Sequence, residues 1–264
     1  MTPAEIETLR QLYTTYERIE SEYPDTHREA TAYVVRHLPK RAHSSGSVAY
    51  SQLTTANADA LIDAQIAYFE EFGCDFEWKH YDYDLPPDLK ARLAARGFEL
   101  DEMETIMALP LAGAPAELLA PVTHDVRRIL DPAQLADIKR IKEEVWGEER
   151  EFVSEFLRHV LLESPQRMSI YIAYADQDPV ACGWIHFAEK GPFASLWGGS
   201  TLAGYRKQGF YTALLAVRVQ EAIARGKQYL TIDASPMSRP IVEHFGFVKL
   251  AESTPCHWHV HTSQ

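Results

Sequence analysis

The hydrophobic and polar positions of this chain follow two different periods, which predicts a protein of mixed helices and strands. Apolar residues recur every three or four positions from 4 to 20, as on the buried face of an amphipathic helix. Phe76 and Trp78 alternate with Glu77 and Lys79, as in a half-buried strand. Over the first 110 residues, the patterns predict helices at 4–20, 57–73 and 86–97 and strands at 30–38, 46–53, 76–84 and 98–109.

A segment rich in Ala, Pro and Gly interrupts this periodicity and predicts a linker over residues 111–121. Beyond it the predicted order is β-α-α-β-β-β-α-β-α-β. A three-stranded meander followed by a β-α-β unit predicts a mixed sheet, antiparallel at first and parallel near the crossover. The strands are expected at 124–130, 169–176, 180–188, 193–201, 229–234 and 247–260, and the helices at 131–147, 150–163, 208–225 and 238–246.

One order of elements occurs twice: helix, glycine, strand, short helix, Gly-Phe, strand. The first copy contains Gly73 and Gly97, and the second contains Gly226 and Gly246. A basic glycine turn precedes the helix of the second copy. The first copy has "SQLTTANADAL" in that place, without Arg or Gly. This weak internal repeat predicts two related units in one chain.

Composition and charge narrow the class of protein. The chain has 264 residues and a formal net charge of -12, which disfavours nucleic acid and anionic lipid as partners. It contains no apolar run of about 18 residues, and its charged, amphipathic N-terminus does not fit a signal peptide. Three widely spaced cysteines are typical of reduced thiols. We therefore expect a cytoplasmic protein that binds no membrane and no nucleic acid; the sequence leaves a homodimer open.

The basic turn is the strongest chemical signal. Arg206, Lys207 and Gly209 stand at the start of a predicted helix, where free N–H groups and the helix dipole attract an anion. Gly209 permits close approach of a ligand to the backbone. The turn lacks the Lys-Ser/Thr of a Walker A loop, and the chain has no G-x-G-x-x-G dinucleotide motif. With these two nucleotide-binding motifs excluded, we interpret the turn as a cradle for a phosphate or pyrophosphate.

The stretch "RKQGFY", residues 206–211, resembles the R/Q-x-x-G-x-G/A signature of the GNAT acyl-CoA-dependent N-acetyltransferases, except that Tyr211 replaces Gly or Ala. "LWGGST" before it resembles the family's pantetheine-binding strand, and "SRPIVEHFGF" resembles its second conserved segment. The resemblance implies an α/β (α+β mixed sheet) GNAT fold in tandem form. Residues 122–264 would be the complete catalytic domain, and residues 1–110 a degenerate GNAT-like domain that shapes the pocket or steadies the fold.

The same resemblance implies acetyl-CoA (coenzyme A) as the cofactor. Backbone amides at the start of the helix would hold the pyrophosphate, with basic side chains in support. Main-chain groups of the preceding strand would pair with the pantetheine arm as if it were an added strand. The cofactor-binding residues implied are Gly199, Ser200, Thr201, Arg206, Lys207, Gln208, Gly209, Phe210, Tyr211, Thr212 and Ser238.

The proton-transfer residues depart from the family pattern. Val242 stands where many relatives have a Tyr acid, and the strand "FASLWGG" lacks the usual Glu base. Asp233, at the end of its predicted strand, is the first candidate base, although an Asp there also caps turns. His244 is a second catalytic candidate. Glu143, Glu144 and Glu155, on the helices that wall the acceptor pocket in relatives, stay open as further bases.

The C-terminal "CHWHVH" places His257, His259 and His261 on one strand face. Because residues two apart on a strand lie about 7 Å apart, three in a row rarely share one ion, and we expect no metal site. The sequence thus predicts transfer of an acetyl group from acetyl-CoA to a primary amine of a small molecule. A non-catalytic acyl-CoA sensor is the alternative, and an acyltransferase for a longer acyl group is a second.

Overall fold

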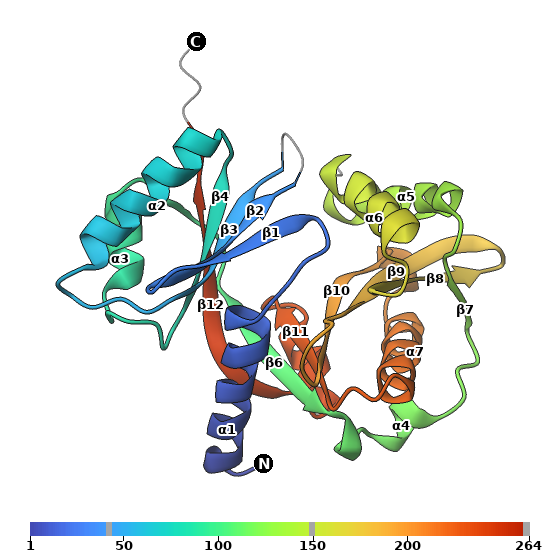
Figure 1. The fold of residues 1–264 in the computed structure, drawn as a ribbon. Helices are drawn as coiled ribbons and strands as arrows, with labels where there is room; N and C mark the ends of the chain where they lie inside the picture. The colour runs from blue at the N-terminus through green and yellow to red at the C-terminus, as the bar shows by residue number, and fades with distance from the viewer. Residues whose placement is uncertain (41–43, 148–150, 261–264) are drawn as a thin grey trace. The chain divides into compact units, whose positions relative to one another are not determined.

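The computed structural model describes residues 1–40, 44–147 and 151–260, which pack as two compact units (Figure 1). Unit 1 comprises Met1–Met107, Ala234–Pro240 and the C-terminal segment from Lys249. Unit 2 comprises Ala108–Asp233 and Ile241–Val248. The last part of the chain therefore divides between the units, a feature that the local sequence does not predict.

Unit 1 is a mixed sheet with helices. Its strands run in the order β1-β2-β3-β4-β12, with β5 also paired to β12. Strand β3 is parallel to β4, and β4 is antiparallel to β12. The elements are α1 (Pro3–Tyr13), the π-helix η1 (Thr14–Ile19), β1 (Thr26–Ala30), β2 (Val34–Pro39), β3 (Gly46–Ser51), α2 (Ala58–Phe72), β4 (Phe76–Tyr81), α3 (Leu89–Ala95), β5 (Glu99–Leu100) and β12 (Val248–Trp258).

Unit 2 has strands in the order β11-β10-β9-β8-β7, antiparallel except for the parallel pair β10–β11. Helices α5 and α6 cover one face of this sheet and α7 the other (Figure 1). The elements are η2 (Leu111–Gly113), α4 (Ala116–Leu119), β7 (Asp125–Arg128), η3 (Pro132–Gln134), α5 (Leu135–Trp146), α6 (Glu151–Glu163), β8 (Met168–Ala175), β9 (Asp178–Phe187), β10 (Phe193–Thr201), η4 (Ala203–Tyr205), α7 (Phe210–Ala224), β11 (Tyr229–Ala234) and α8 (Arg239–His244). Strand β6 (Glu104–Pro110) runs from unit 1 into unit 2.

The structure corrects the expected strand at 30–38. Two antiparallel strands, β1 and β2, flank a tight turn in this region. The Thr31 hydroxyl accepts hydrogen bonds from the N–H groups of Tyr33 and Val34, at 3.2 and 3.0 Å. A threonine hydroxyl that bonds the backbone in this way stabilises a turn and interrupts a strand.

The segment at 111–121 is packed on unit 2 rather than extended. It forms η2 and α4, with Leu111 and Leu118 buried. The side-chain amide of Gln220 donates to the carbonyls of Leu118 and Ala120, at 3.0 and 2.9 Å. Its small and Pro-rich composition predicts a linker, but Leu111 and Leu118 have apolar surface that the fold buries.

The internal repeat is visible in the topology. In each unit a helix ends at a left-handed glycine, Gly73 or Gly226, and leads to a strand that pairs in parallel with the strand before the helix. The cysteines Cys74, Cys182 and Cys256 are free and buried. Within the described ranges, every helix is too short or too polar to cross a bilayer.

Candidate functional site

Strand β10 separates from β11 part of the way along its length. The parallel register begins at Phe193 opposite Tyr229 and ends at Leu196 opposite Ile232, whereas β10 continues to Thr201. On its other side, β10 stays paired with β9 as far as Thr201. Among the described residues of unit 2, no strand therefore pairs with the β11-facing edge of residues 197–201, and such an edge can pair with an extended ligand.

A β-bulge lies where this divergence begins. Trp197 pairs with Trp184 and Ser200 with Cys182, so two residues of β10 face one residue of β9. Gly198 within the bulge has φ +66°, and a Cβ there would lie 2.0 Å from carbons of the Trp184 ring. Bulges bend a strand and disrupt its ladder, and here the bend coincides with the end of pairing to β11.

We expect Gly198→Ala to destabilise unit 2 by about 1–3 kcal/mol more than Gly226→Ala, because the added methyl group overlaps the Trp184 ring. Gly226 is the matched control: its φ is +72°, but a Cβ there meets nothing within 4 Å. Urea unfolding followed by tryptophan fluorescence measures both variants. Equal losses for the two would show that the bulge relaxes around the methyl group.

The turn after β10 presents free main-chain donors. Lys207 and Gly209 have left-handed φ values of +62° and +86°, and α7 begins at Phe210. The successive N–H groups from Gln208 to Thr212 donate no hydrogen bond within the described ranges. Left-handed turn residues before a helix N-terminus form a concave group of N–H donors, and the helix dipole adds positive potential. Such a turn can bind an anion through the backbone alone.

Side chains hold the turn in place. Arg206 Nε donates to the carbonyl of Thr201 at 3.2 Å, and the Gln208 amide donates to the carbonyl of Gly204 at 2.8 Å. His124 Nε2 lies 2.9 Å from the Gln208 carbonyl, which can only accept, so this nitrogen carries the proton. His124 lies far from the turn in sequence and belongs to no motif, so no local pattern predicts its contact with the turn.

Gly209 and His124 are closely fitted. A Cβ on Gly209 would lie 2.9 Å from His124 Cε1, and the His124 ring stacks edge-on against Phe210 at 4.8 Å between centroids. The turn thus requires glycine for two reasons: the left-handed φ and the imidazole beside it. The Lys207 ammonium, exposed on this turn, has no ion-pair partner in the described part of the chain.

The end of β10 carries two side-chain hydroxyls. Trp146, at the end of α5, donates from its indole N–H to Ser200 Oγ at 3.0 Å. The Thr201 hydroxyl is buried and has no hydrogen-bond partner among the described residues. Tyr211 Cε2 would lie 3.7 Å from a Cβ on Gly199, an ordinary contact, so the fold accommodates Tyr in place of Gly or Ala. Burial raises the pKa of Tyr211, which therefore stays protonated near neutral pH.

These features fit a phosphorylated ligand with an amide-bearing arm. The cradle at Gly209 suits a pyrophosphate, and the open edge of β10 suits alternating amide groups. All predicted cofactor residues from Gly199 to Thr212 belong to unit 2. Ser238 belongs to unit 1, where its hydroxyl lies in a turn 3.2 Å from Ser235 Oγ.

The catalytic candidates are separate from the cradle in sequence. Asp233 is the second-to-last residue of β11 and is half-buried. His244 ends α8, is exposed, and stacks edge-on against the Phe245 ring. Val242 is completely buried, so the position of the family's acid holds a packed aliphatic side chain. Of the helical acids, Glu143 lies 3.8 Å from Lys139, while Glu144 and Glu155 are exposed.

The terminal histidines lie apart from this site in sequence and belong to unit 1. His259 Nδ1 lies 2.8 Å from Asp75 Oδ2, and His257 Nε2 lies 3.7 Å from Asp101 Oδ2. Burial raises the pKa of Asp75, but its hydrogen bonds with the His259 side chain and the Val260 N–H bring this pKa below its ordinary value. His261 lies outside the described residues. The two described histidines therefore contact different carboxylates.

Comparisons with known proteins agree with this geometry. Residues 133–247 match the profile of the Acetyltransferase (GNAT) family. A GCN5-related N-acetyltransferase from Kribbella flavida has 13% identity and a TM-score of 0.67, over 96% of this chain and 95% of its own. A tandem GNAT protein from the clavulanic acid biosynthesis pathway has 12% identity and a TM-score of 0.60, over 99% of this chain and 90% of its own.

A GCN5-related N-acetyltransferase from Sphaerobacter thermophilus has 12% identity and a TM-score of 0.60, over 100% of this chain and 95% of its own. No curated protein sequence matches the chain. At these identities the solved structures show the fold, which is the GNAT fold over nearly the whole chain.

Proposed function

We propose that the chain transfers an acetyl group from acetyl-CoA to the primary amine of a small molecule, and the match of residues 133–247 to the acetyltransferase (GNAT) family model supports this proposal. The observation that most supports this proposal is the group of free N–H donors from Gln208 to Thr212 beside the open edge of β10. We keep residues 122–264 as the proposed catalytic domain and residues 1–110 as a degenerate GNAT-like domain.

The residues present fit coenzyme A. The free amides from Gln208 to Thr212 would hold its pyrophosphate, and Lys207 and Arg206 would add charge. The main-chain groups of residues 199–201 would pair with the pantetheine amides, and the orphaned Thr201 hydroxyl is available to the same arm. Acetyl-CoA supplies an already activated thioester, so this chain must mainly position the amine and move protons.

The acceptor must lose a proton before it attacks, since an ammonium with a pKa near ~10 has no free lone pair. We propose Asp233 as the base, because it follows the only part of β11 that pairs with β10 in the described structure. A main-chain N–H on the open edge of β10 would stabilise negative charge on the thioester oxygen. With Val242 in the place of the usual acid, water would protonate the leaving thiolate.

We expect Asp233→Asn to lower kcat by roughly 100-fold or more while the KM for acetyl-CoA stays within about twofold, as for loss of a general base. His244→Gln is the matched comparison, since His244 is the second candidate. Initial rates from pH 6 to 9 measure both variants. An Asp233→Asn enzyme with the wild-type pH–rate profile would remove Asp233 as the base.

The experiment that tests the function is turnover of acetyl-CoA to free thiol with a panel of primary amines, with the acetylated product identified by mass spectrometry. Product with any amine supports the transferase. Acetyl-CoA binding without turnover on every amine supports the alternative, a non-catalytic acyl-CoA sensor, for which the buried Val242 is the favouring observation. Longer acyl-CoA thioesters in the same assay test the acyl preference.

A further inference from the structure

Unit 1 contains a cleft at the end of its own parallel strand pair. Strands β3 and β4 are in register from Gly46 opposite Phe76 to Val48 opposite Trp78, and β3 continues to Ser51 beyond the last pair. A cleft of about 520 Å³ lies there, between the end of β3, helix α1 and the loop after β4. Ligands of α/β sheets bind in crevices outside the carboxyl ends of parallel strands, and this volume is in the range of small-molecule sites.

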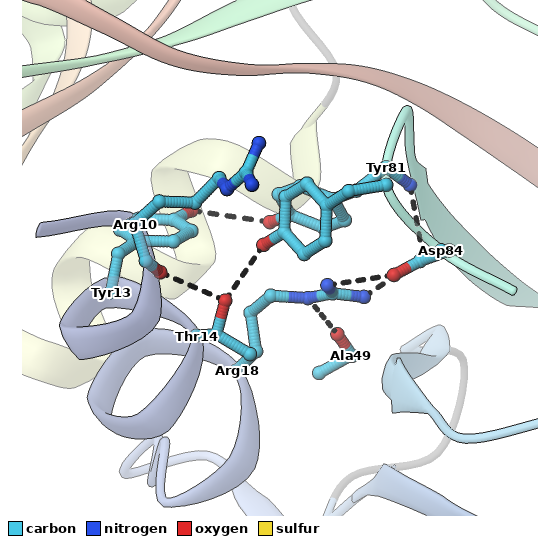
Figure 2. Close-up of polar contacts among 8 residues, drawn as sticks. Arg10, Tyr13, Thr14, Arg18, Ala49, Tyr81 and Asp84 are labelled. Carbon is cyan, nitrogen blue, oxygen red and sulfur yellow. Dashed lines mark hydrogen bonds and ion pairs between the residues drawn. The ribbon is translucent and has the colours of Figure 1, made fainter. Parts of the chain in front are cut away.

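Beside this cleft, Arg18 links the end of β3 to the loop after β4, where the two strands no longer pair. Its Nε donates to the Ala49 carbonyl at 3.0 Å, and its guanidinium donates to both oxygens of Asp84, at 2.8 and 2.9 Å (Figure 2). The same guanidinium lies 3.7 Å from the centroid of the Tyr81 ring. The β3 carbonyl that an amide-bearing arm would need is therefore already bonded, and the cleft differs in this respect from the open edge of β10.

The charged groups that line the cleft are neutralised within the protein. Asp84 is bonded to Arg18 and also accepts from the Tyr81 N–H at 3.0 Å (Figure 2). Glu7 is paired with Arg10, whose guanidinium lies over the Tyr83 ring at 5.0 Å. A charged ligand would compete with the buried pair of Arg18 and Asp84, so the cleft favours a neutral one.

Polar groups without partners remain at the end of β3. Ser51 belongs to the lining of the cleft and is 5% exposed, and its buried hydroxyl has no hydrogen-bond partner in the described part of the chain. A buried hydroxyl without a partner is unfavourable, and a ligand hydroxyl would supply the missing hydrogen bond. Tyr50 and Gln52 flank it in the lining and make no side-chain hydrogen bond to the described residues. Hydroxyl, phenol and amide groups together match a ligand rich in hydroxyls.

We propose that this cleft binds a neutral sugar. Its hydroxyls would exchange hydrogen bonds with Ser51 and Gln52, and a sugar ring has an apolar face that suits the half-buried tyrosines Tyr50 and Tyr83. The site is separate from the cofactor residues of unit 2, and it stands on contacts within unit 1 alone. It is a second ligand site, in addition to the proposed acetyl transfer.

Ligand-observed saturation-transfer NMR on the full chain tests the proposal. The probes are glucose, N-acetylglucosamine and trehalose, with the cation glucosamine and the anion glucose 6-phosphate for comparison. We expect saturation transfer to at least one neutral sugar and weaker transfer to the charged ones. Ser51→Ala should weaken that binding about 3- to 10-fold, the loss of one neutral hydrogen bond.

Ser253→Ala is the matched control, because Ser253 is also a buried serine of unit 1 with an unpartnered hydroxyl and does not line the cleft. Both variants should keep or raise the Tm, since each removes an unpaired buried polar group. The proposal is overturned if no neutral sugar binds, if only a charged probe binds, or if Ser51→Ala and Ser253→Ala bind equally. Acetyl-CoA affinity should be unchanged in Ser51→Ala, so failure here leaves the proposed acetyl transfer untouched.

Discussion

Gly209→Trp is expected to lower the affinity for acetyl-CoA by at least about 100-fold, or roughly 2.7 kcal/mol. The indole would occupy the space in front of the free N–H groups, where the pyrophosphate is proposed to bind. Gly209 also has a left-handed φ of +86°, and a Cβ there meets His124 at 2.9 Å. The variant therefore also displaces the imidazole that bonds the Gln208 carbonyl. Isothermal titration calorimetry measures the affinity.

The control is Gly204→Trp, five residues earlier and also exposed, in the short helix η4. Gly204 has no left-handed φ, and a Cβ there meets nothing within 4 Å, so the same side chain is added without strain. Thermal unfolding with and without acetyl-CoA separates binding from folding. At a concentration of about 100 times Kd, the wild type and Gly204→Trp should gain roughly 5–10 °C in Tm. Normal stabilisation of Gly209→Trp would contradict the assignment of the cradle.

Asp84→Ala is expected to destabilise unit 1 by about 3–5 kcal/mol, because it leaves Arg18 buried without its carboxylate. The side chains of Arg18 and Asp84 are 1% and 3% exposed. Burial lowers the pKa of Arg18, but Asp84 and the neighbouring tyrosines Tyr83 and Tyr81 raise it above its ordinary value, so the guanidinium stays charged. Urea unfolding followed by circular dichroism measures the loss.

The double variant Arg18→Met/Asp84→Leu removes both charges. It therefore separates the contribution of the ion pair to the free energy of unfolding from the loss that a buried, unpaired guanidinium causes. We expect it to be more stable than Asp84→Ala by at least about 1 kcal/mol, since a packed apolar pair often replaces a buried ion pair without loss. A matched exposed pair, Lys139 and Glu143, should contribute less than about 1 kcal/mol. A loss below 1 kcal/mol for Asp84→Ala would mean that water reaches the guanidinium.

Much of the site was predictable because its signals are local. The basic glycine turn identifies the start of α7 from neighbouring residues alone, and the strand predicted at 193–201 has the bounds of β10. The helix start needed a correction of two residues: Gly209 is left-handed, so α7 begins at Phe210 rather than at 208. Val242 was also identifiable from its spacing to Gly246, and its burial agrees with a packing role.

The repeat of helix, glycine and strand, the mixed sheet and the glycine turn at Gly209 are predictable from the residues alone, because each depends on periodicity or on the backbone freedom of single residues. It takes the folded chain to see that His124 supports the turn, that Gly198 gives room to the Trp184 ring, and that Arg18 bonds Asp84 beside the first strand pair. These contacts join residues far apart in sequence, and no local pattern encodes which distant side chains the packed core brings within hydrogen-bond reach.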